Sequence, residues 1–171
     1  MILGMTTSTF TLVHVLLSLA GIGSGFVVVF GLLTNNRLNG WTTIFLTTTV
    51  LTSVTGFLFP FHQVTPGIIL GVLSLIVLAF TIAARYAFHL SGRWRSTYVI
   101  SAMVALYFNC FVGVVQSFEK IPALKALAPT QKEPPFAVAQ LVVLAIFMAL
   151  GVLAVKKFKL NTPQSARATA A

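Results

Sequence analysis

Five long apolar runs divide the chain, and charged residues are almost confined to the segments between them. The runs cover about residues 10–33, 41–61, 67–88, 98–118 and 136–155. Each has about 20 residues, and an α-helix of that length, rising 1.5 Å per residue, crosses a hydrocarbon layer of roughly 30 Å. The pattern predicts an all-α, polytopic membrane bundle with five transmembrane helices.

The segments between the runs are short. The longest, residues 119–135, is well below the roughly 50 residues of the smallest soluble domains. Within it, Pro122 can begin a helix and Pro129 ends one, so we expect an interfacial helix over residues 122–128. We therefore expect residues 1–160 to form a single transmembrane domain, followed by a disordered tail over the small, polar residues 161–171.

Composition agrees with a membrane protein. The chain is 57% hydrophobic and 8% charged, whereas a soluble domain carries about 25% charged residues. A net charge of +9 could indicate nucleic-acid binding, but the basic residues lie at the ends of the runs and form no patch with interleaved aromatic residues. We expect no nucleic-acid partner. The single cysteine, Cys110, excludes an internal disulfide and is expected to be a small core residue.

The basic residues also indicate an orientation, because short loops rich in lysine and arginine stay in the cytoplasm. Five spans place eight basic residues on the side of the carboxyl-terminus, and three on the side of the amino-terminus. The eight are Arg37, Arg85, Arg93, Arg95, Lys156, Lys157, Lys159 and Arg167; the three are Lys120, Lys125 and Lys132. Both acids, Glu119 and Glu133, lie on the side of the amino-terminus. We expect the amino-terminus outside and the tail in the cytoplasm.

The first run has an alternative interpretation as a cleaved signal peptide. Ser18-Leu19-Ala20 resembles a small-residue cleavage site after an apolar stretch. Residues 1–9 carry no positive charge, however, and the apolar run continues to Leu33. We therefore expect the first span to remain in the protein.

Small and polar residues recur at helical spacing on the first two runs, so each run has one polar stripe. The first stripe consists of His14, Ser18, Gly21 and Gly25, and the second of Thr48, Thr52, Thr55, Phe59 and His62. The glycine pair permits close approach of another helix. Threonines can return their hydroxyls to the carbonyl of the preceding turn, or they can line a path for a polar solute. Pro60 denies a hydrogen bond to the Gly56 carbonyl, so we expect this helix to loosen near its outer end.

The fourth run contains the deepest polar side chain, Asn109, near the bilayer centre. An amide at that depth needs a partner, either on another helix or in a ligand. Its stripe continues outward to Gln116, and Gln140 lies one turn into the fifth run at a similar depth. We expect Gln116 and Gln140 to be able to meet.

These stripes place several polar side chains in the outer half of the bundle. The candidate ligand-binding residues are His14, His62, Asn109, Gln116, Gln140, Thr52 and Thr55. They could surround a quinone, a lipid or another apolar molecule. His14 and His62 could also supply the axial nitrogens of a haem, although His14 lies about 6 Å deeper. A metal held by His14, His62 and Glu119 has suitable ligand types but no supporting spacing within one helix.

The inner side is basic. Gly71, Ser74, Leu78, Thr81 and Arg85 form one stripe of the third run, and Arg85 is close enough to the boundary to extend its charge to the surface. We expect a collar of basic side chains suited to anionic phospholipid headgroups on the cytoplasmic side. Its members are Arg37, Arg85, Arg93, Arg95, Lys156, Lys157 and Lys159. The same residues can act as a topology signal alone.

Two segments carry a resemblance to known sequences. Ser53-Val-Thr-Gly-Phe-Leu-Phe-Pro-Phe-His62 and residues 109–140, which include Ile121-Pro-Ala-Leu-Lys-Ala-Leu-Ala-Pro-Thr-Gln-Lys-Glu-Pro-Pro-Phe136, resemble a family of small, uncharacterised bacterial multi-span proteins. The resemblance covers about the second to fifth spans. It implies a location in the bacterial inner membrane, and no activity. Similar sequences would have a histidine in place of Lys125 and an aliphatic residue in place of Cys110, and the first difference argues against a metal on the outer loop.

Three classes of function are compatible with these observations. The first is a non-catalytic membrane component, either a self-associating bundle or an accessory subunit of a larger complex, since no catalytic constellation is visible. The second is a module that binds quinone, lipid or haem in the outer half. The third is a transporter or channel for small solutes, although five spans without an internal repeat do not divide into two equal halves.

Overall fold

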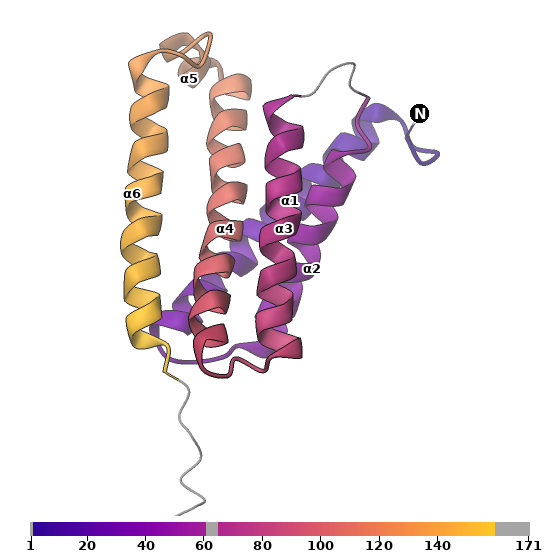
Figure 1. Ribbon diagram of the computed structural model, residues 1–171. Coiled ribbons are helices and arrows are strands. Elements are labelled where there is room, and N and C mark those ends of the chain that lie inside the picture. Colours follow the sequence, from indigo (N-terminus) through magenta and orange to yellow (C-terminus); the bar gives the residue numbers. More distant parts are fainter. Residues whose placement is uncertain (1, 61–64, 160–171) are drawn as a thin grey trace, which may run out of the picture.

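The computed structural model describes residues 2–60 and 65–159, and these form helices joined by short loops (Figure 1). The elements are α1 (Thr7–Leu33), α2 (Asn39–Gly56), α3 (Pro66–Ile82), η1 (Ala83–Ala87), α4 (Arg93–Lys120), α5 (Pro122–Leu127) and α6 (Pro134–Lys157). The expected all-α class is confirmed, and the described part of the chain contains no sheet. Residues 161–171, expected to be a disordered tail, lie outside the described residues.

Four of these helices are long and apolar enough to cross a membrane: α1, α3 together with η1, α4 and α6. This is the architecture of a multi-pass membrane protein. The second expected span, residues 41–61, is the exception among the residues that the structure describes. Its helix α2 has 18 residues, a length of about 27 Å, but its many threonines leave it without a stretch as apolar as those of the four candidate spans.

Local sequence explains where the helices begin and end. The Thr6 hydroxyl accepts a hydrogen bond from the Thr9 backbone N–H at the start of α1, and Thr65 does the same for Ile68 at the start of α3. Pro66, Pro122 and Pro134 occupy first turns, where no N–H is needed. α2 ends at Gly56 rather than continuing to residue 61, because Pro60 cannot donate and disfavours helical backbone at Phe59. The expected loosening is confirmed.

α3, α4 and α6 run along one common direction, and α1 crosses behind them at a tilt (Figure 1). α1 packs against α2, α4 and α6, while α3 packs between α2 and α4. The short helix α5 lies at the end of the bundle where α4 ends and α6 begins. A short helix at this position was expected from Pro122 and Pro129. We call this end of the bundle the α5 end. The other end carries Arg37, Arg85, Arg93, Arg95, Lys156, Lys157 and Lys159, and we call it the basic end.

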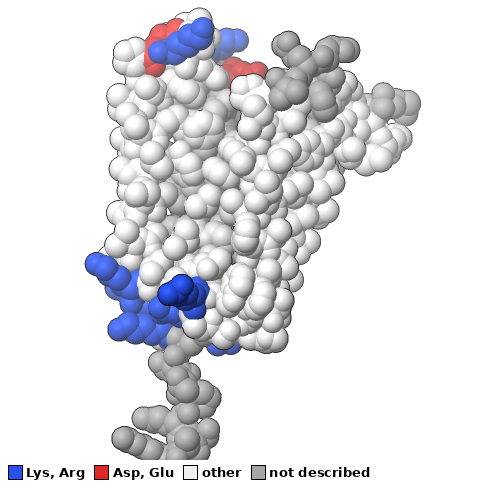
Figure 2. Space-filling model, viewed as in Figure 1, with Lys and Arg blue, Asp and Glu red and all other residues white. Residues whose placement is uncertain are grey.

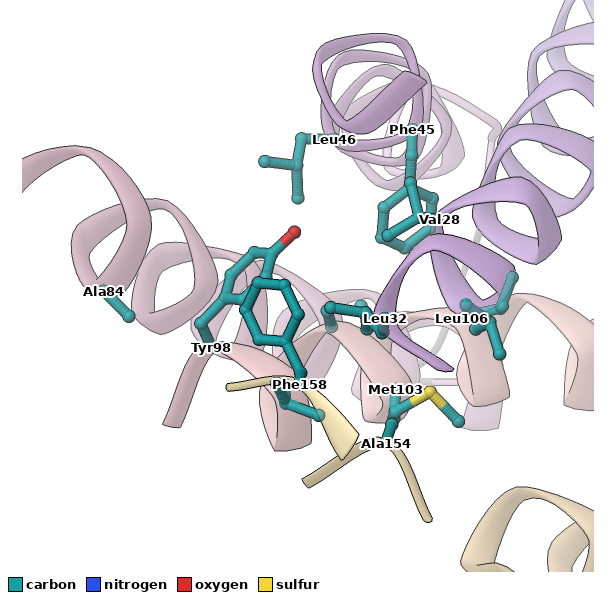
Figure 3. Close-up of a cluster of buried hydrophobic side chains, with 14 of the residues drawn as sticks. Val28, Leu32, Phe45, Leu46, Ala84, Tyr98, Met103, Leu106, Ala154 and Phe158 are labelled. Carbon is teal, nitrogen blue, oxygen red and sulfur yellow. The ribbon is translucent and has the colours of Figure 1, made fainter. Parts of the chain in front are cut away.

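The hydrophobic core lies mainly in the half of the bundle toward the basic end. Figure 3 shows Val28 and Leu32 of α1 beside Phe45 of α2, Leu106 of α4 and Ala154 of α6. Tyr98 is 0% and Phe158 1% exposed within this cluster. The basic end is therefore tightly packed, whereas α6 and α3 expose most of their apolar surface along their length. Those surfaces suit contact with lipid.

Candidate functional site

His14 of α1 faces α2 near the α5 end. Its Nδ1 lies 2.8 Å from the Thr55 hydroxyl oxygen, and its ring packs edge-on against Phe59, with centroids 5.3 Å apart. Phe10, one turn earlier on α1, contacts the same Phe59 ring. The structure therefore brings together two of the predicted site residues, His14 and Thr55, in a small aromatic cluster.

The hydrogen bonds of Thr55 determine the tautomer of His14. The Thr55 hydroxyl donates to the Leu51 carbonyl of the preceding turn at 2.7 Å, and a hydroxyl has only one hydrogen to donate. The Thr55 oxygen must therefore accept from His14 Nδ1–H. The neutral ring then carries its lone pair on Nε2, and no described residue donates to that atom. His14 is half-buried, so Nε2 is an available acceptor in the apolar part of the bundle.

Asn109 of α4 forms a hydrogen bond to a side chain of another helix. Its Nδ2 donates to the Thr49 hydroxyl of α2 at 3.2 Å. Gly21 of α1 covers the pair: a Cβ at Gly21 would lie 3.2 Å from the Thr49 hydroxyl and 3.3 Å from Asn109 Nδ2. The close approach expected for the Gly21 and Gly25 stripe is confirmed, and three helices meet at this amide.

His14 and Asn109 do not share one site. Asn109 lies beside Gly21, which is seven residues, or about 10 Å, further along α1 than His14. Gln116, two turns beyond Asn109 on α4, is exposed. Figure 1 shows the reason: α1 leans away from α4 toward the α5 end, so the stripe of α4 that is buried at Ser101 and Ala105 becomes exposed at Val112 and Gln116.

Gln140 joins α6 to α4 through the backbone instead of through Gln116. Its Nε2 donates to the Phe111 carbonyl at 3.2 Å, and Gln131 donates to the Val115 carbonyl, one turn further along α4, at 3.1 Å. Gln140 is 9% exposed, and its Oε1 is buried with no partner among the described residues. The Thr52 hydroxyl is also buried and has no hydrogen-bond partner among the described residues.

The remaining candidates do not assemble a metal site in the described residues. His62 lies outside those residues, so the paired-histidine haem and the His14, His62 and Glu119 metal site stay predictions. Glu119 is exposed, with its carboxylate 3.7 Å from the Lys120 ammonium. No group of three histidine, cysteine or acidic side chains suited to a metal is present in the described part of the chain.

The basic end contains a second polar cluster, centred on Arg85. Its guanidinium donates to the Tyr98 hydroxyl at 2.9 Å, to Asn39 Oδ1 at 2.6 Å and to the Arg37 carbonyl at 3.3 Å. It also lies 5.2 Å from the Tyr98 ring centroid. Arg85 differs from the expectation of a charge extended to the headgroups, because it is 8% exposed and turned into the bundle.

Neither acidic side chain of the protein compensates the Arg85 charge. The chain has only two acidic side chains, Glu119 and Glu133, and Figure 2 shows the acidic atoms at the opposite end. A buried cation without such a partner must be stabilised by neutral acceptors and aromatic faces, which is the role of Asn39, Tyr98 and the Arg37 carbonyl. Arg85 lies within the π-helical turn η1, a type of distortion that is frequent at functional positions.

The other basic side chains of this end are at the surface. Arg37, Arg93, Lys156, Lys157 and Lys159 are exposed, and Arg95 is half-buried; Figure 2 shows blue atoms gathered below an uncharged middle zone. Arg95 also donates to the Phe158 carbonyl, and the Lys159 backbone N–H donates to Asn35 Oδ1 at 2.8 Å. These bonds tie the end of α6 to α4 and to the loop after α1.

Comparison of the chain with protein-family models, with curated proteins and with solved structures finds no match. The resemblance to small bacterial inner-membrane proteins therefore stays a prediction. Any function has to be argued from the residues of this chain.

Proposed function

We propose that this protein is a non-catalytic, integral membrane component, acting as an accessory subunit of a membrane complex or as a self-associating bundle. The observation that carries this proposal is that several polar side chains of the helices form hydrogen bonds to a neighbouring helix. Asn109 is bonded to Thr49, His14 to Thr55, Ser53 to Ser74 and Gln140 to a backbone carbonyl. Such bonds fasten helices together, and they leave few groups for chemistry on a substrate.

A five-span topology follows if the four long apolar helices cross the bilayer. α2 begins beside Arg85 at the basic end, where its Asn39 is bonded, and ends near His14 at the α5 end. A helix that connects one end of α1 to the opposite end of α3 must cross the same layer. We place the α5 end outside and the basic end in the cytoplasm of a bacterial inner membrane, because six cations at the surface of the basic end favour retention there.

The proposal is tested by purification from the native membrane. The tagged protein is extracted in native nanodiscs, and its mass is compared with the mass of one chain, 18.4 kDa. We expect a stoichiometric partner protein or a defined multimer. Recovery of single chains alone, at native expression level and without chemical treatment, would contradict both forms of the proposal.

A second function, binding of a quinol or haem in the outer half, is favoured by the tautomer of His14. Its Nε2 lone pair can accept from a quinol hydroxyl or coordinate a haem iron. Phe10 and Phe59 provide apolar surface beside it.

Two substitutions separate the roles of the His14 ring nitrogens. His14→Asn can keep the bond to Thr55 but lacks Nε2, whereas Thr55→Val removes the bond and keeps Nε2. Binding of a fluorescent quinol analogue, or a Soret band after purification, should be lost in His14→Asn and weakened in Thr55→Val. Equal behaviour of both variants and the parent protein would exclude this second function.

A further inference from the structure

A groove lies between α3 and α4 in the half of the bundle toward the basic end. It has a volume of about 310 Å³ and is lined by Val77 and Phe80 of α3 and by Thr97, Ile100, Ser101 and Val104 of α4. Phe80 and Ile100 are each 53% exposed, so the groove opens on the outer surface of the bundle. In a membrane this surface faces the acyl chains of one leaflet.

The walls of the groove present almost only carbon. Its two hydroxyls are bonded to the backbone of their own helix: Thr97 donates to the Arg93 carbonyl at 3.2 Å, and Ser101 donates to the Thr97 carbonyl at 2.7 Å. Their hydrogens are therefore not offered to a polar solute. A hydrocarbon chain forms no hydrogen bonds, so it is compatible with such a lining.

One end of the groove is cationic. Arg93 begins α4 one turn before Thr97, and residues four apart lie on the same face of a helix, so Arg93 follows the lining residues toward the basic end. Its side chain is exposed, and both acids of the chain are at the opposite end of the bundle. The Trp94 ring of α4 stacks on the ring of Phe88, the residue that follows η1, with centroids 3.8 Å apart. Tryptophan is enriched at the level of lipid headgroups.

We propose that this groove binds one anionic phospholipid, with an acyl chain along Val77, Phe80, Ile100 and Val104 and the headgroup phosphate at Arg93. The inference goes beyond the proposed function, because it specifies one lipid and one site instead of a collar of equivalent basic residues. A zwitterionic lipid carries its own cation beside the phosphate, so it gains less from Arg93. The occupant is a lipid and not free phosphate, since the groove itself is apolar.

The two tryptophans of the chain allow a direct measurement. Replacing the exposed Trp41 with phenylalanine leaves Trp94, at the headgroup end of the groove, as the only tryptophan. The full-length protein is reconstituted in nanodiscs of phosphatidylcholine with a small fraction of brominated phosphatidylglycerol or of brominated phosphatidylcholine. Bromine quenches a nearby tryptophan, so the ratio of the two quenching curves gives the relative affinity at Trp94. Both leaflets have the same composition, so the result does not depend on the proposed orientation or partner.

We expect phosphatidylglycerol to be preferred about fivefold, the equivalent of about 1 kcal/mol for one arginine near the surface. Arg93→Gln should bring this preference close to one. Lys157→Gln, which removes an equal charge at the same end on α6, should leave it unchanged. Val104→Phe, which narrows the groove, should also reduce the preference, whereas Val142→Phe on the exposed surface of α6 should not.

Two outcomes would overturn the proposal. One is equal quenching by the two lipids in the parent protein. The other is a preference that falls equally in Arg93→Gln and Lys157→Gln, since the basic end would then act as a whole and not through this groove.

Discussion

The guanidinium of Arg85 and the hydroxyl of Tyr98 form a hydrogen bond of 2.9 Å inside the basic end, with both side chains buried. This bond joins η1 to α4, and Asn39 extends it to the start of α2. The charge is thus held by three separate segments of the chain. Replacing Arg85 should therefore weaken the packing of all three segments.

Tyr98→Phe keeps the ring over Arg85 but removes the acceptor. Because a buried group left without its partner costs about 1–3 kcal/mol, we expect the thermal unfolding midpoint in detergent to fall clearly. Tyr86→Phe is the matched control, since Tyr86 is exposed and its hydroxyl makes only a long contact of 3.4 Å with Thr43. An equal loss in both variants would show that the bond to Arg85 has no special role.

Gly25→Ala tests the close contact of α1 with its neighbours. A Cβ at this position would lie 2.4 Å from Leu106 Cδ1 and 3.0 Å from the Phe45 ring, and both neighbours are 1% exposed in the core. Overpacking of this kind costs about 1–3 kcal/mol. Gly23→Ala provides the control on the same helix, since nothing lies within 4 Å of its Cβ position. Thermal unfolding should separate the two variants, and an unchanged Gly25→Ala protein would contradict the packing of α1.

Asn109 and Thr49 should be coupled. We expect a double-mutant cycle of Asn109→Leu and Thr49→Val to give an interaction energy of about 0.6 kcal/mol, the average measured for hydrogen bonds between membrane helices, and no more than the maximum of about 1.7 kcal/mol. The free energies of unfolding of the four proteins supply the measurement. Strictly additive losses would mean that the 3.2 Å contact contributes nothing.

The proposed orientation predicts which end can be labelled from outside the cell. In a Cys110→Ala background, Thr130→Cys should react with a membrane-impermeant maleimide on intact cells, and Lys157→Cys only after lysis. Thr130 and Lys157 are both exposed, at opposite ends of the bundle. The reverse pattern would place the basic end outside.

The hydrophobic pattern predicted the long helices, with α3 and η1 taken together, to within five residues at each end. Periodicity placed Ser74, Leu78, Thr81 and Arg85 on one stripe, and the structure buries all four, Arg85 against expectation. The second run was less informative. Thr47, Thr48 and Thr49 are adjacent and identical, so composition does not reveal which of them faces inward. The structure buries Thr49 and Ser53, which are displaced by one residue from the predicted Thr48 and Thr52.

Other features could not be predicted because they depend on how helices cross. The tilt of α1 exposes Gln116, although its spacing from Asn109 is that of an inward stripe. The partners of Arg85 are 13 residues away at Tyr98 and 46 residues away at Asn39. An arginine near a span boundary normally reaches for the headgroups, and only the packed end of the bundle shows that this one turns inward.

The separation of charge between the two ends also has an electrical consequence. Seven described cations and no acidic side chain lie at the basic end, whereas the α5 end carries both acids and three lysines, Lys120, Lys125 and Lys132. Each elementary charge moved across a membrane does work of about 2.3 kcal/mol per 100 mV. In the proposed orientation, with the basic end in a negative cytoplasm, inverting the molecule would move the larger group of cations against the voltage. The membrane potential itself would then hold the bundle in the orientation in which it was inserted.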